Sequence, residues 1–527
     1  MRASRTRPNP ASLGLLVLGL LFAGSSWAIE DAACVEFKAI EVKTNALLDS
    51  ATAFDRVSSL AGRCIDAQLI RDILSSISSY FIEQGYVTTR PYLLEQDISD
   101  GEIDIDVLIG SIEAIVDADS GNSNASIAGA FAFHDQVLNL RELETSLETI
   151  ERPQSVQATF EIRPGNRQGS SIVAVKTEES RPFRIELGAN ARTDVDPQLS
   201  FRASLDNPFN INDIVEFRYN SGDVFQAYQS DRSREVEYSV GFGSYQLSIS
   251  HSDITYKQRL QGLSGSLLAE GESVSDKLRL GKLLSRGQNY RFNLGIGIEL
   301  EDSRNLFEGE VIDVSSYRTS KAGIELRHDW YARWGQLLTR YAYQQGLDSF
   351  GARDDGFFTA EEGIDEQARL QFEKHILESQ FYYYLSNPSW SIQLKFHGQY
   401  SGDLLFAADK LFLGSENTVR GYTSALGGSN GWYARNDLVK RLQSFSNPFS
   451  GSPLTKLITL SLGIDYGEIR CEADNPDLCG DIYGLGAGIE VNDDNFSGLL
   501  SWGHPLQELD QDIGSEDVFL LDFRWSL

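Results

Sequence analysis

The stretch YRFNLGIGIEL, Tyr290–Leu300, alternates between apolar residues and polar or small residues. Its apolar side chains share one face of an extended chain, because side chains of a strand alternate with a period of two. Arg291, Asn293 and Glu299 share the opposite face. A second stretch, Trp390–Tyr400 (WSIQLKFHGQY), repeats the pattern. Many such segments, rich in aromatic and glycine residues, favour a mainly β protein that forms a membrane barrel around a wet lumen.

The amino terminus has the order of a secretory signal peptide. Three arginines among the first seven residues precede an apolar run, Leu13–Ala23, and Ser26-Trp27-Ala28 supplies small residues for cleavage. We predict a signal peptide over residues 1–28, because the run is short for a membrane anchor of about 20 residues. No later segment has the pattern of a transmembrane helix. An exported chain of alternating strands indicates a bacterial cell outer membrane.

The composition is acidic, with 76 Asp and Glu residues, 46 Lys and Arg residues and a formal net charge of −30. Nucleic acid is therefore excluded as a partner, since phosphates attract the opposite charge. Two explanations of the acidity stay open. Acidic surface loops can serve solubility or a saline habitat, or they can bind divalent cations, although no EF-hand spacing is present. We predict no cofactor and no metal site.

The chain has four cysteines, an even number in an exported protein. Cys34 and Cys64 lie near the amino terminus, and Cys471 and Cys479 bracket an acidic stretch. No histidine accompanies either pair, which disfavours metal ligation. An oxidising compartment favours two disulfides, Cys34–Cys64 and Cys471–Cys479.

Two small α/β units precede the barrel. In the first, Asp66 begins a helix with apolar residues at spacings of three and four, and Gly85 ends it. Strands over residues 87–94 and 103–109 follow. In the second, Asn139 begins a helix that ends at Pro153, and a hairpin follows. We predict domains over residues 29–116, 117–181 and, from the first regular run of strands, 182–527.

Two groups of motifs stand in the two α/β units. The first is Arg63-Cys64, Gly85-Tyr86-Val87-Thr88, Glu95-Gln96-Asp97 and Asp100-Gly101, and the second is Leu138–Leu143, Pro164-Gly165 and Gly169-Ser170-Ser171. They resemble the first and second polypeptide-transport-associated (POTRA) domains of one family, the two-partner secretion (type V) outer-membrane transporters of the hemolysin secretion/activation type. Val419-Arg420-Gly421-Tyr422 resembles the tip of the family's sixth extracellular loop, which folds into the lumen. Gly463-Ile464-Asp465-Tyr466-Gly467 resembles its lumenal strand motif.

The resemblance implies a 16-stranded antiparallel transmembrane β-barrel preceded by two small periplasmic α/β POTRA domains, with an inward-folding loop around residues 401–435. It implies capture of an unfolded partner, a large secreted β-helical exoprotein, in the periplasm and its translocation to the cell surface. The alternative within the superfamily is an outer-membrane protein assembly or insertion factor. A porin is disfavoured, because porins need no periplasmic domains. Outer-membrane lipid and the barrel-assembly machinery are the other expected partners.

We expect two features of the family to be missing from this chain. Cys34 follows the predicted cleavage site closely, which leaves no room for the plug helix that some members carry. The chain ends in Leu527 where members usually end in an aromatic residue, with Phe523 and Trp525 on the same strand face.

We predict that Arg420 pairs with Asp465 inside the barrel. In the strand that carries Asp465, apolar side chains alternate with Gly463, Asp465 and Gly467, which must then face the lumen. The two glycines clear space beside the carboxylate, and Gly421 allows a tight turn beside Arg420. A guanidinium–carboxylate fork supplies two parallel bonds that lysine does not reproduce. The alternative is a solvent-exposed arginine in an ordinary loop.

No motif supports an enzyme. Gly427–Gly431 fits the pattern G-x-S-x-G of a nucleophile elbow, but that motif needs a strand before it and a helix after it. The glycines of Gly484–Gly488 alternate as strand residues do, and no lysine of a phosphate-binding loop follows. We therefore predict no catalytic residue.

Overall fold

The computed structural model describes residues 34–43, 47–132, 136–193, 195–222, 230–262, 265–355, 368–423, 426–443, 457–472, 478–507 and 515–527. The predicted signal peptide lies outside the described residues. The chain forms two compact units, one of residues up to Tyr80 with Arg90–Leu108, and one of Phe81–Thr89 with Ile109–Leu527. Within the described ranges, no helix has the length and apolarity needed to cross a membrane.

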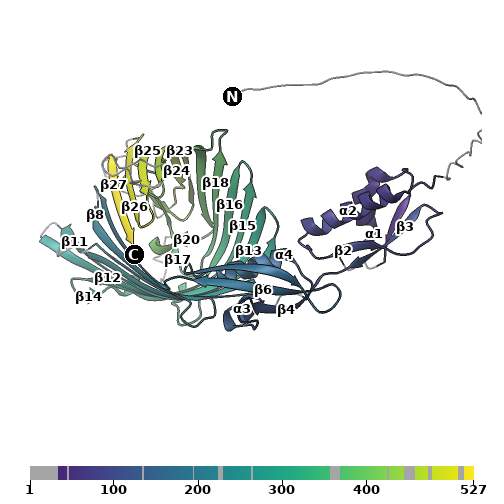
Figure 1. The fold of residues 1–527 in the computed structure, drawn as a ribbon. Coiled ribbons are helices and arrows are strands. Elements are labelled where there is room, and N and C mark those ends of the chain that lie inside the picture. Colours follow the sequence, from purple (N-terminus) through teal and green to yellow (C-terminus); the bar gives the residue numbers. More distant parts are fainter. Residues whose placement is uncertain are drawn as a thin grey trace, which may run out of the picture. The chain divides into compact units, whose positions relative to one another are not determined.

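The first unit contains a three-stranded sheet with helices (Figure 1). Its strand order is β1-β3-β2, with β1 parallel and β2 antiparallel to β3. Side chains of the second helix and the third strand, such as Ile73 and Ile105, form its buried core. The elements are β1 (Ala39–Val42), α1 (Ser50–Val57), η1 (Ser58–Leu60), α2 (Ala67–Glu83), β2 (Arg90–Leu93) and β3 (Glu102–Leu108).

The predicted limits of the long helix are confirmed by α2. The carboxylate of Asp66 accepts a hydrogen bond from the backbone N–H of Leu69 at 2.7 Å, as an N-cap does. Gly85 ends the helix with a φ of +95°, a conformation that favours glycine. The short helix α1 was not predicted; Asp49 caps it by accepting from the N–H of Thr52.

A second three-stranded sheet belongs to the other unit and corrects the predicted domain boundary. Its order is β4-β6-β5, with β4 parallel and β5 antiparallel to β6. The boundary after residue 116 was therefore misplaced, because β4 pairs with β6 and starts at residue 111. The elements are β4 (Ser111–Asp117), α3 (Ala125–Ala130), α4 (Leu140–Ile150), β5 (Val156–Pro164) and β6 (Ser170–Glu179). We call residues 111–179 the second α/β domain.

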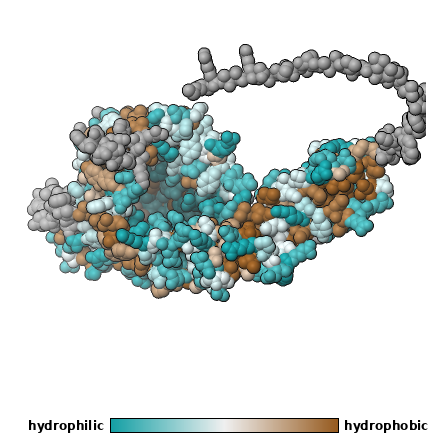
Figure 2. Space-filling view, in the orientation of Figure 1, coloured by the Kyte–Doolittle hydropathy of each residue, from teal (hydrophilic) through white to brown (hydrophobic). Residues whose placement is uncertain are grey.

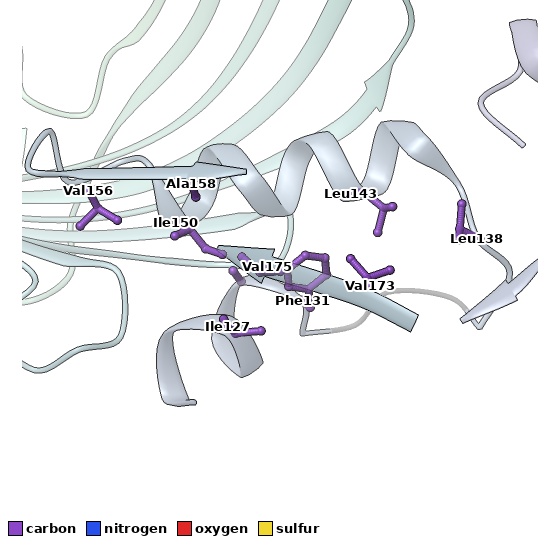
Figure 3. Close-up of a cluster of buried hydrophobic side chains, with 10 residues drawn as sticks. Ile127, Phe131, Leu138, Leu143, Ile150, Val156, Ala158, Val173 and Val175 are labelled. Atoms are coloured by element: carbon purple, nitrogen blue, oxygen red, sulfur yellow. The ribbon is translucent and has the colours of Figure 1, made fainter. Parts of the chain in front are cut away.

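Both helices of this domain pack on its sheet through one apolar cluster (Figure 3). Asn139 caps α4 by accepting from the N–H of Arg141, as the sequence predicted. The β5–β6 turn is held by the Glu113 carboxylate, which accepts from the Ser170 hydroxyl and from the backbone and side-chain N–H groups of Asn166. These bonds to the charged form lower the pKa of Glu113 to about 2.

The rest of this unit is a closed barrel of 16 antiparallel strands (Figure 1). Strand β27 pairs with β7 and closes the ring. The short strand β14 (Glu310–Val311) lies outside the count, since β13 pairs directly with β15. The barrel strands are β7 (Phe183–Arg192), β8 (Val195–Asp206), β9 (Asp213–Ser221), β10 (Ser230–Phe242), β11 (Tyr245–Gly262), β12 (Gly265–Arg286), β13 (Tyr290–Phe307), β15 (Tyr317–Ala332), β16 (Gly335–Leu347), β18 (Glu373–Tyr384), β19 (Trp390–Ser401), β23 (Gly431–Gln443), β24 (Leu457–Ile469), β25 (Gly480–Asn492), β26 (Phe496–Pro505) and β27 (Val518–Ser526).

The two faces of the barrel wall follow the alternation of the sequence. On β24, Leu462 and Ile464 are 54% and 55% exposed on the outer face, while Asp465 between its apolar neighbours is fully buried on the inner face. Apolar side chains gather on the outside of the barrel, beside a hollow with hydrophilic walls (Figure 2). The outer face is therefore suited to lipid and the inner face to water.

The second α/β domain is docked on the turns at one end of the barrel. The Arg152 guanidinium donates to the backbone carbonyl of Ser239 at 2.6 Å and to that of Asn212 at 3.3 Å. Burial lowers the pKa of Arg152, against the opposing effect of nearby carboxylates. On the neighbouring turn, Glu148 pairs with Arg286 at 2.9 Å and with Arg291. This domain and the barrel are thus joined by partly buried polar contacts as well as by the chain.

Candidate functional site: the inward-folding loop

The site is built by residues 402–430, which connect β19 to β23 and which we call the inward-folding loop. Its outer part is a hairpin in which β21 pairs antiparallel with β22. Its tip, Gly414–Tyr422, lies against the inner faces of β24, β25 and β26. The elements of the loop are β20 (Leu404–Leu405), η4 (Ala407–Asp409), β21 (Leu411–Leu413) and β22 (Leu426–Gly428).

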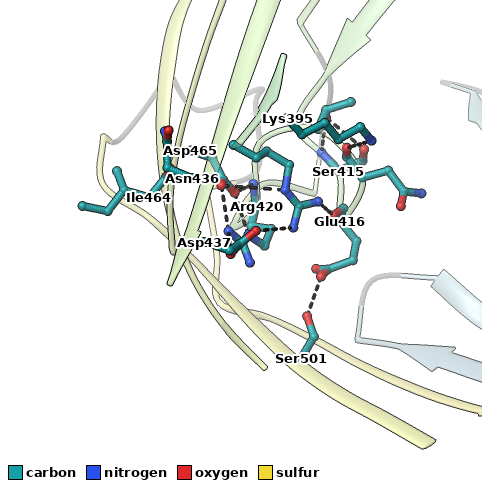
Figure 4. A network of polar contacts seen from close by, with 12 residues as sticks. Lys395, Ser415, Glu416, Arg420, Asn436, Asp437, Ile464, Asp465 and Ser501 are labelled. Atoms are coloured by element: carbon teal, nitrogen blue, oxygen red, sulfur yellow. Dashed lines mark hydrogen bonds and ion pairs between the residues drawn. The ribbon is translucent and has the colours of Figure 1, made fainter. Parts of the chain in front are cut away.

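Arg420 at the tip forms a fork with Asp465 of β24 (Figure 4). Its Nε donates to Oδ2 of Asp465 at 2.6 Å, and its Nη2 donates to Oδ1 at 2.7 Å. The backbone N–H of Arg420 also donates to Oδ2, at 3.1 Å. Arg420 is 3% exposed and Asp465 is fully buried, so water screens this pair little. The predicted contact between these residues is present.

A second carboxylate, which the sequence did not reveal, lies beside the fork. Arg420 Nη2 donates to Oδ1 of Asp437 on β23 at 2.8 Å. Arg435, on the same face of β23, donates to the backbone carbonyl of Glu416 in the loop. The alternation of β23 places both residues on the lumenal face, but only strand pairing brings Asp437 opposite Gly463.

Glycines on three strands make room for the arginine. A Cβ added at Gly463 of β24 would lie 2.7 Å from Arg420 Nη2, and one at Gly486 of β25 would lie 2.2 Å from its Cζ. At Gly503 of β26 it would lie 2.9 Å from Cβ of Arg420. Gly463 was predicted; Gly486 and Gly503 were not, although period-two glycines on β25 were a usable signal. The wall thus has a glycine-lined recess that the arginine fills.

The conformation of the tip itself requires glycine at position 421. Gly421 has a φ of +92°, and an added Cβ would lie 2.2 Å from the backbone carbon of His504. Gly467, the other predicted wall glycine, faces Val419 and Leu413 rather than the arginine. Any side chain at Gly421 would therefore push the tip off the wall.

Apolar side chains also hold the loop against the barrel wall. Val419 and Tyr422 are buried in a cluster with residues of β21, β22 and three barrel strands: Leu411, Leu413, Leu426, Tyr433, Ile469 and Ile482. The Tyr422 hydroxyl donates to the backbone carbonyl of Tyr483 at 2.7 Å. The four residues of the Val419–Tyr422 motif are therefore all used in holding the tip against the wall.

Two disulfides join the four cysteines. Cys34 is bonded to Cys64 in the first α/β unit, with Cα atoms 5.3 Å apart. Cys471 is bonded to Cys479 in the connection between β24 and β25, with Cα atoms 4.9 Å apart. Cys479 packs against the apolar cluster of the inward-folding loop.

Glu472, next to Cys471, holds the turn that was weighed as a nucleophile elbow. Its carboxylate accepts from the backbone N–H of Ser429 at 3.1 Å and from the side chain of Asn430 at 2.7 Å. Ser429 is fully buried, and its hydroxyl accepts from the N–H of Leu405. Strand β22 precedes this turn and strand β23 follows it, so it lacks the helix of a nucleophile elbow.

Replacing Cys34 and Cys64 together by serine is expected to destabilise the first α/β unit by about 3 kcal/mol, because the bond closes a loop of 30 residues in the unfolded chain. Hydrogen exchange on the full chain measures the effect within residues 34–108. The variant lacking Cys471 and Cys479 is the control and should leave exchange in that unit unchanged. Peptide mass mapping that finds free thiols at Cys34 and Cys64 in the non-reduced protein would contradict the assignment.

No group of three or more His, Cys, Asp or Glu side chains in the described part of the chain is arranged to hold a metal ion. The polar groups of the site are ion pairs and hydrogen bonds that join the loop to the wall. Chemically, this arrangement positions a chain segment inside a pore.

Comparison with known proteins gives the family. The family described as "Haemolysin secretion/activation protein ShlB/FhaC/HecB" matches residues 169–491. The "POTRA domain, ShlB-type" family matches residues 35–110, and a further POTRA domain family matches residues 111–164.

Curated relatives and solved structures agree with this match. The chain is 26% identical to the outer membrane transporter CdiB of Dickeya dadantii over 90% of its length and 83% of the relative. It is 27% identical to the hemolysin transporter protein ShlB of Serratia marcescens, over 85% of its length and 78% of the relative. The fold matches the structure of CdiB from Escherichia coli with a TM-score of 0.83 at 22% identity, over 96% and 92% of the two chains. The chain belongs to the haemolysin secretion/activation (ShlB/FhaC/HecB) family, whose members are two-partner secretion transporters of the outer membrane with periplasmic POTRA domains.

Proposed function

We propose that this chain captures one large, unfolded β-helical exoprotein in the periplasm and passes it through the barrel to the cell surface. The observation that carries the proposal is the loop tip that Arg420 holds inside a barrel with a hydrophilic inner wall. The family match favours secretion over the assembly of other barrels. A cognate exported protein is implied by the family, and its identity as a β-helical protein is our proposal.

Capture is assigned to the two POTRA domains, which we place at residues 29–110 and 111–181. Each has a three-stranded sheet with two edge strands, β1 and β2 in the first and β4 and β5 in the second. An extended client segment can add to such an edge through backbone hydrogen bonds, which tolerate many sequences. This mode suits an unfolded client.

Two further partners follow from the outer face of the barrel. Lipid is assigned to its exposed apolar side chains, such as Leu462 and Ile464. The barrel-assembly machinery is assigned to the last strand and the residue after it, where Phe523, Trp525 and Leu527 are exposed.

The test is to express this chain with the exported protein encoded beside its gene and to measure that protein at the cell surface and in the medium. We expect secretion only when both proteins are present. An exoprotein that stays in the periplasm although the barrel is inserted would overturn the proposal. A strain with the barrel of a porin in place of this chain controls for leakage through an open pore.

A further inference from the structure

The first part of the inward-folding loop makes ionic contacts of its own, on strands that Arg420 does not touch. We call residues 402–410 the entry limb. Asp409 of this limb accepts from Nζ of Lys374 on β18 at 3.1 Å, and it pairs with Nζ of Lys321 on β15 at 3.1 Å. The side chains of Asp409, Lys321 and Lys374 are 10%, 12% and 7% exposed. Two barrel strands thus converge on one loop carboxylate that water hardly reaches.

The backbone of Asp409 is held by the same part of the wall. Its carbonyl oxygen accepts from Lys374 Nζ at 3.1 Å and from the side-chain amide of Gln399 on β19 at 3.0 Å. These contacts lie on β15, β18 and β19, whereas those of Arg420 lie on β23 and β24. The loop is therefore anchored to the barrel wall at two separate places, at Asp409 and at Arg420.

The two anchors differ in the partners that their barrel residues keep after the loop residue moves away. Lys321 has a second carboxylate on the wall, Glu301 of β13 at 3.6 Å, and Lys374 lies 5.4 Å from the ring centre of Phe372. Both lysines therefore keep a favourable neighbour when Asp409 leaves. Asp465 also has a second cation on the wall, Arg435, whose Nε lies 3.8 Å from Oδ1, but it is fully buried and receives three hydrogen bonds from Arg420, so it loses more when its loop partner leaves.

The entry limb is joined to its surroundings by contacts that are separate from those of the tip. Gly402 at its start has open space around it, and at its end β21 is fixed by pairing with β22. Between these points, β20 pairs over two residues with β17 (Ala368–Arg369), and Phe406 packs against Tyr317. Figure 1 shows β17 and β20 next to each other within the barrel. The limb thus runs between a glycine with open space beside it and a fixed hairpin, and in between Leu405 is buried and donates its N–H to the Ser429 hydroxyl at 3.0 Å.

We propose that Asp409 is a positioning residue for transport. It holds the entry limb against β15 and β18 in the resting pore, and its contacts with Lys321 and Lys374 break when the exoprotein enters. The tip stays on Asp465 throughout. The proposal deepens the proposed function and rests on it for the release step. The anchoring step concerns the pore alone and holds without a client.

The anchoring step is tested by single-channel recording of the purified full chain in planar lipid bilayers. Asp409→Asn keeps the shape of the side chain and removes its charge, so we expect the ratio of open to closed dwell times to rise about tenfold. The comparison variant is Glu301→Gln, which removes from Lys321 the carboxylate that it keeps when Asp409 leaves, so the ratio should stay at or fall below the parental value. An unchanged ratio in Asp409→Asn, or an equal rise in Glu301→Gln, would overturn the proposal.

The release step is tested by a cross-link. Ala368 and Leu404 are paired in the β17–β20 register, and a disulfide between Ala368→Cys and Leu404→Cys fits the spacing of adjacent strands. The oxidised double variant should insert normally and lose secretion at least about tenfold, while each single variant secretes as the parent does. Full secretion with the cross-link formed, as judged by mass mapping, would overturn release. If Asp409→Asn opens the pore but the parent chain secretes no exoprotein, the anchoring role of Asp409 is supported and the proposed function is refuted.

Discussion

Arg420→Ala is expected to reduce secretion of the partner exoprotein at least about tenfold while the barrel still folds and inserts. Removing the guanidinium leaves the carboxylate of Asp465 buried without its main partner, and such losses cost about 3–5 kcal/mol. This loss destabilises the inward position of the loop. It does not destabilise the barrel, because the barrel strands pair without Arg420. Secretion is measured in the medium and insertion by heat-modifiable migration of the barrel.

Graded variants sharpen this test. Asp465→Ala leaves Arg420 with Asp437 at 2.8 Å, so it should impair secretion strongly but less than Arg420→Ala. Asp437→Ala should impair it least, because the fork remains. Arg420→Lys keeps the charge and loses the parallel bonds, so it should resemble Arg420→Ala more than the parent.

The matched control is Arg318→Ala, because Arg318 also pairs with an aspartate, Asp302, at 2.9 Å. Both side chains of that pair are about half exposed, and exposed pairs contribute at most about 1 kcal/mol. Secretion should therefore stay at the parental level. Full secretion by Arg420→Ala, or equal loss in Arg318→Ala, would refute the role of the loop tip. Exchange of the two charges in Arg420→Asp with Asp465→Arg is expected to restore secretion in part only, since the fork geometry changes.

Deletion of residues 29–180 is expected to leave a barrel that inserts and a strain that secretes no more than one without the transporter. Both sheets and their edge strands are lost, and with them the strands to which we assign binding of an extended client. Secretion and insertion are measured as for Arg420→Ala. Secretion close to the parental level would place client capture elsewhere in the chain.

A shorter deletion separates capture from docking. Deletion of residues 34–108 removes the first POTRA domain and keeps the contacts of Arg152 and Glu148 with the barrel turns. If the first domain captures the client, this deletion abolishes secretion too, although the barrel turns keep their partners. Arg152→Ala in the full chain is the reverse control. It weakens the docking of the second α/β domain on the barrel and keeps both sheets.

The sequence predicted those parts of the fold whose cause is local. Alternation along β13, β19 and β24 fixed the inner and outer faces, and Asp66 and Gly85 marked the ends of α2. The strand β4 was not predicted, and the boundary after residue 116 was misplaced for a physical reason. Only two residues separate β3 from β4, and the partner of β4 is β6, which lies more than 50 residues further along the chain. No local pattern tells which of two sheets such a strand joins.

The same limit applies to the site. Asp465 was recognised because its own strand carries two glycines on the same face, but Asp437, Gly486 and Gly503 surround Arg420 only after four strands have paired. Asp409 carried no signal, because its partners Lys321 and Lys374 come from strands that precede it at long range. Residues that become neighbours only when distant strands pair, such as Asp437 and Gly503, were therefore not predicted from the sequence.

The glycine-lined recess has a consequence for the order in which the barrel is made. Three of the strands that line or close it, β24, β25 and β26, follow the inward-folding loop in the chain, and the wall leaves no space beside Gly421, where His504 is in backbone contact. A tip of this width does not slide into place past strands that are already paired. We expect the late strands to pair around a loop that is already inside, so that the tip reaches its place on the wall during assembly of the barrel and not after it.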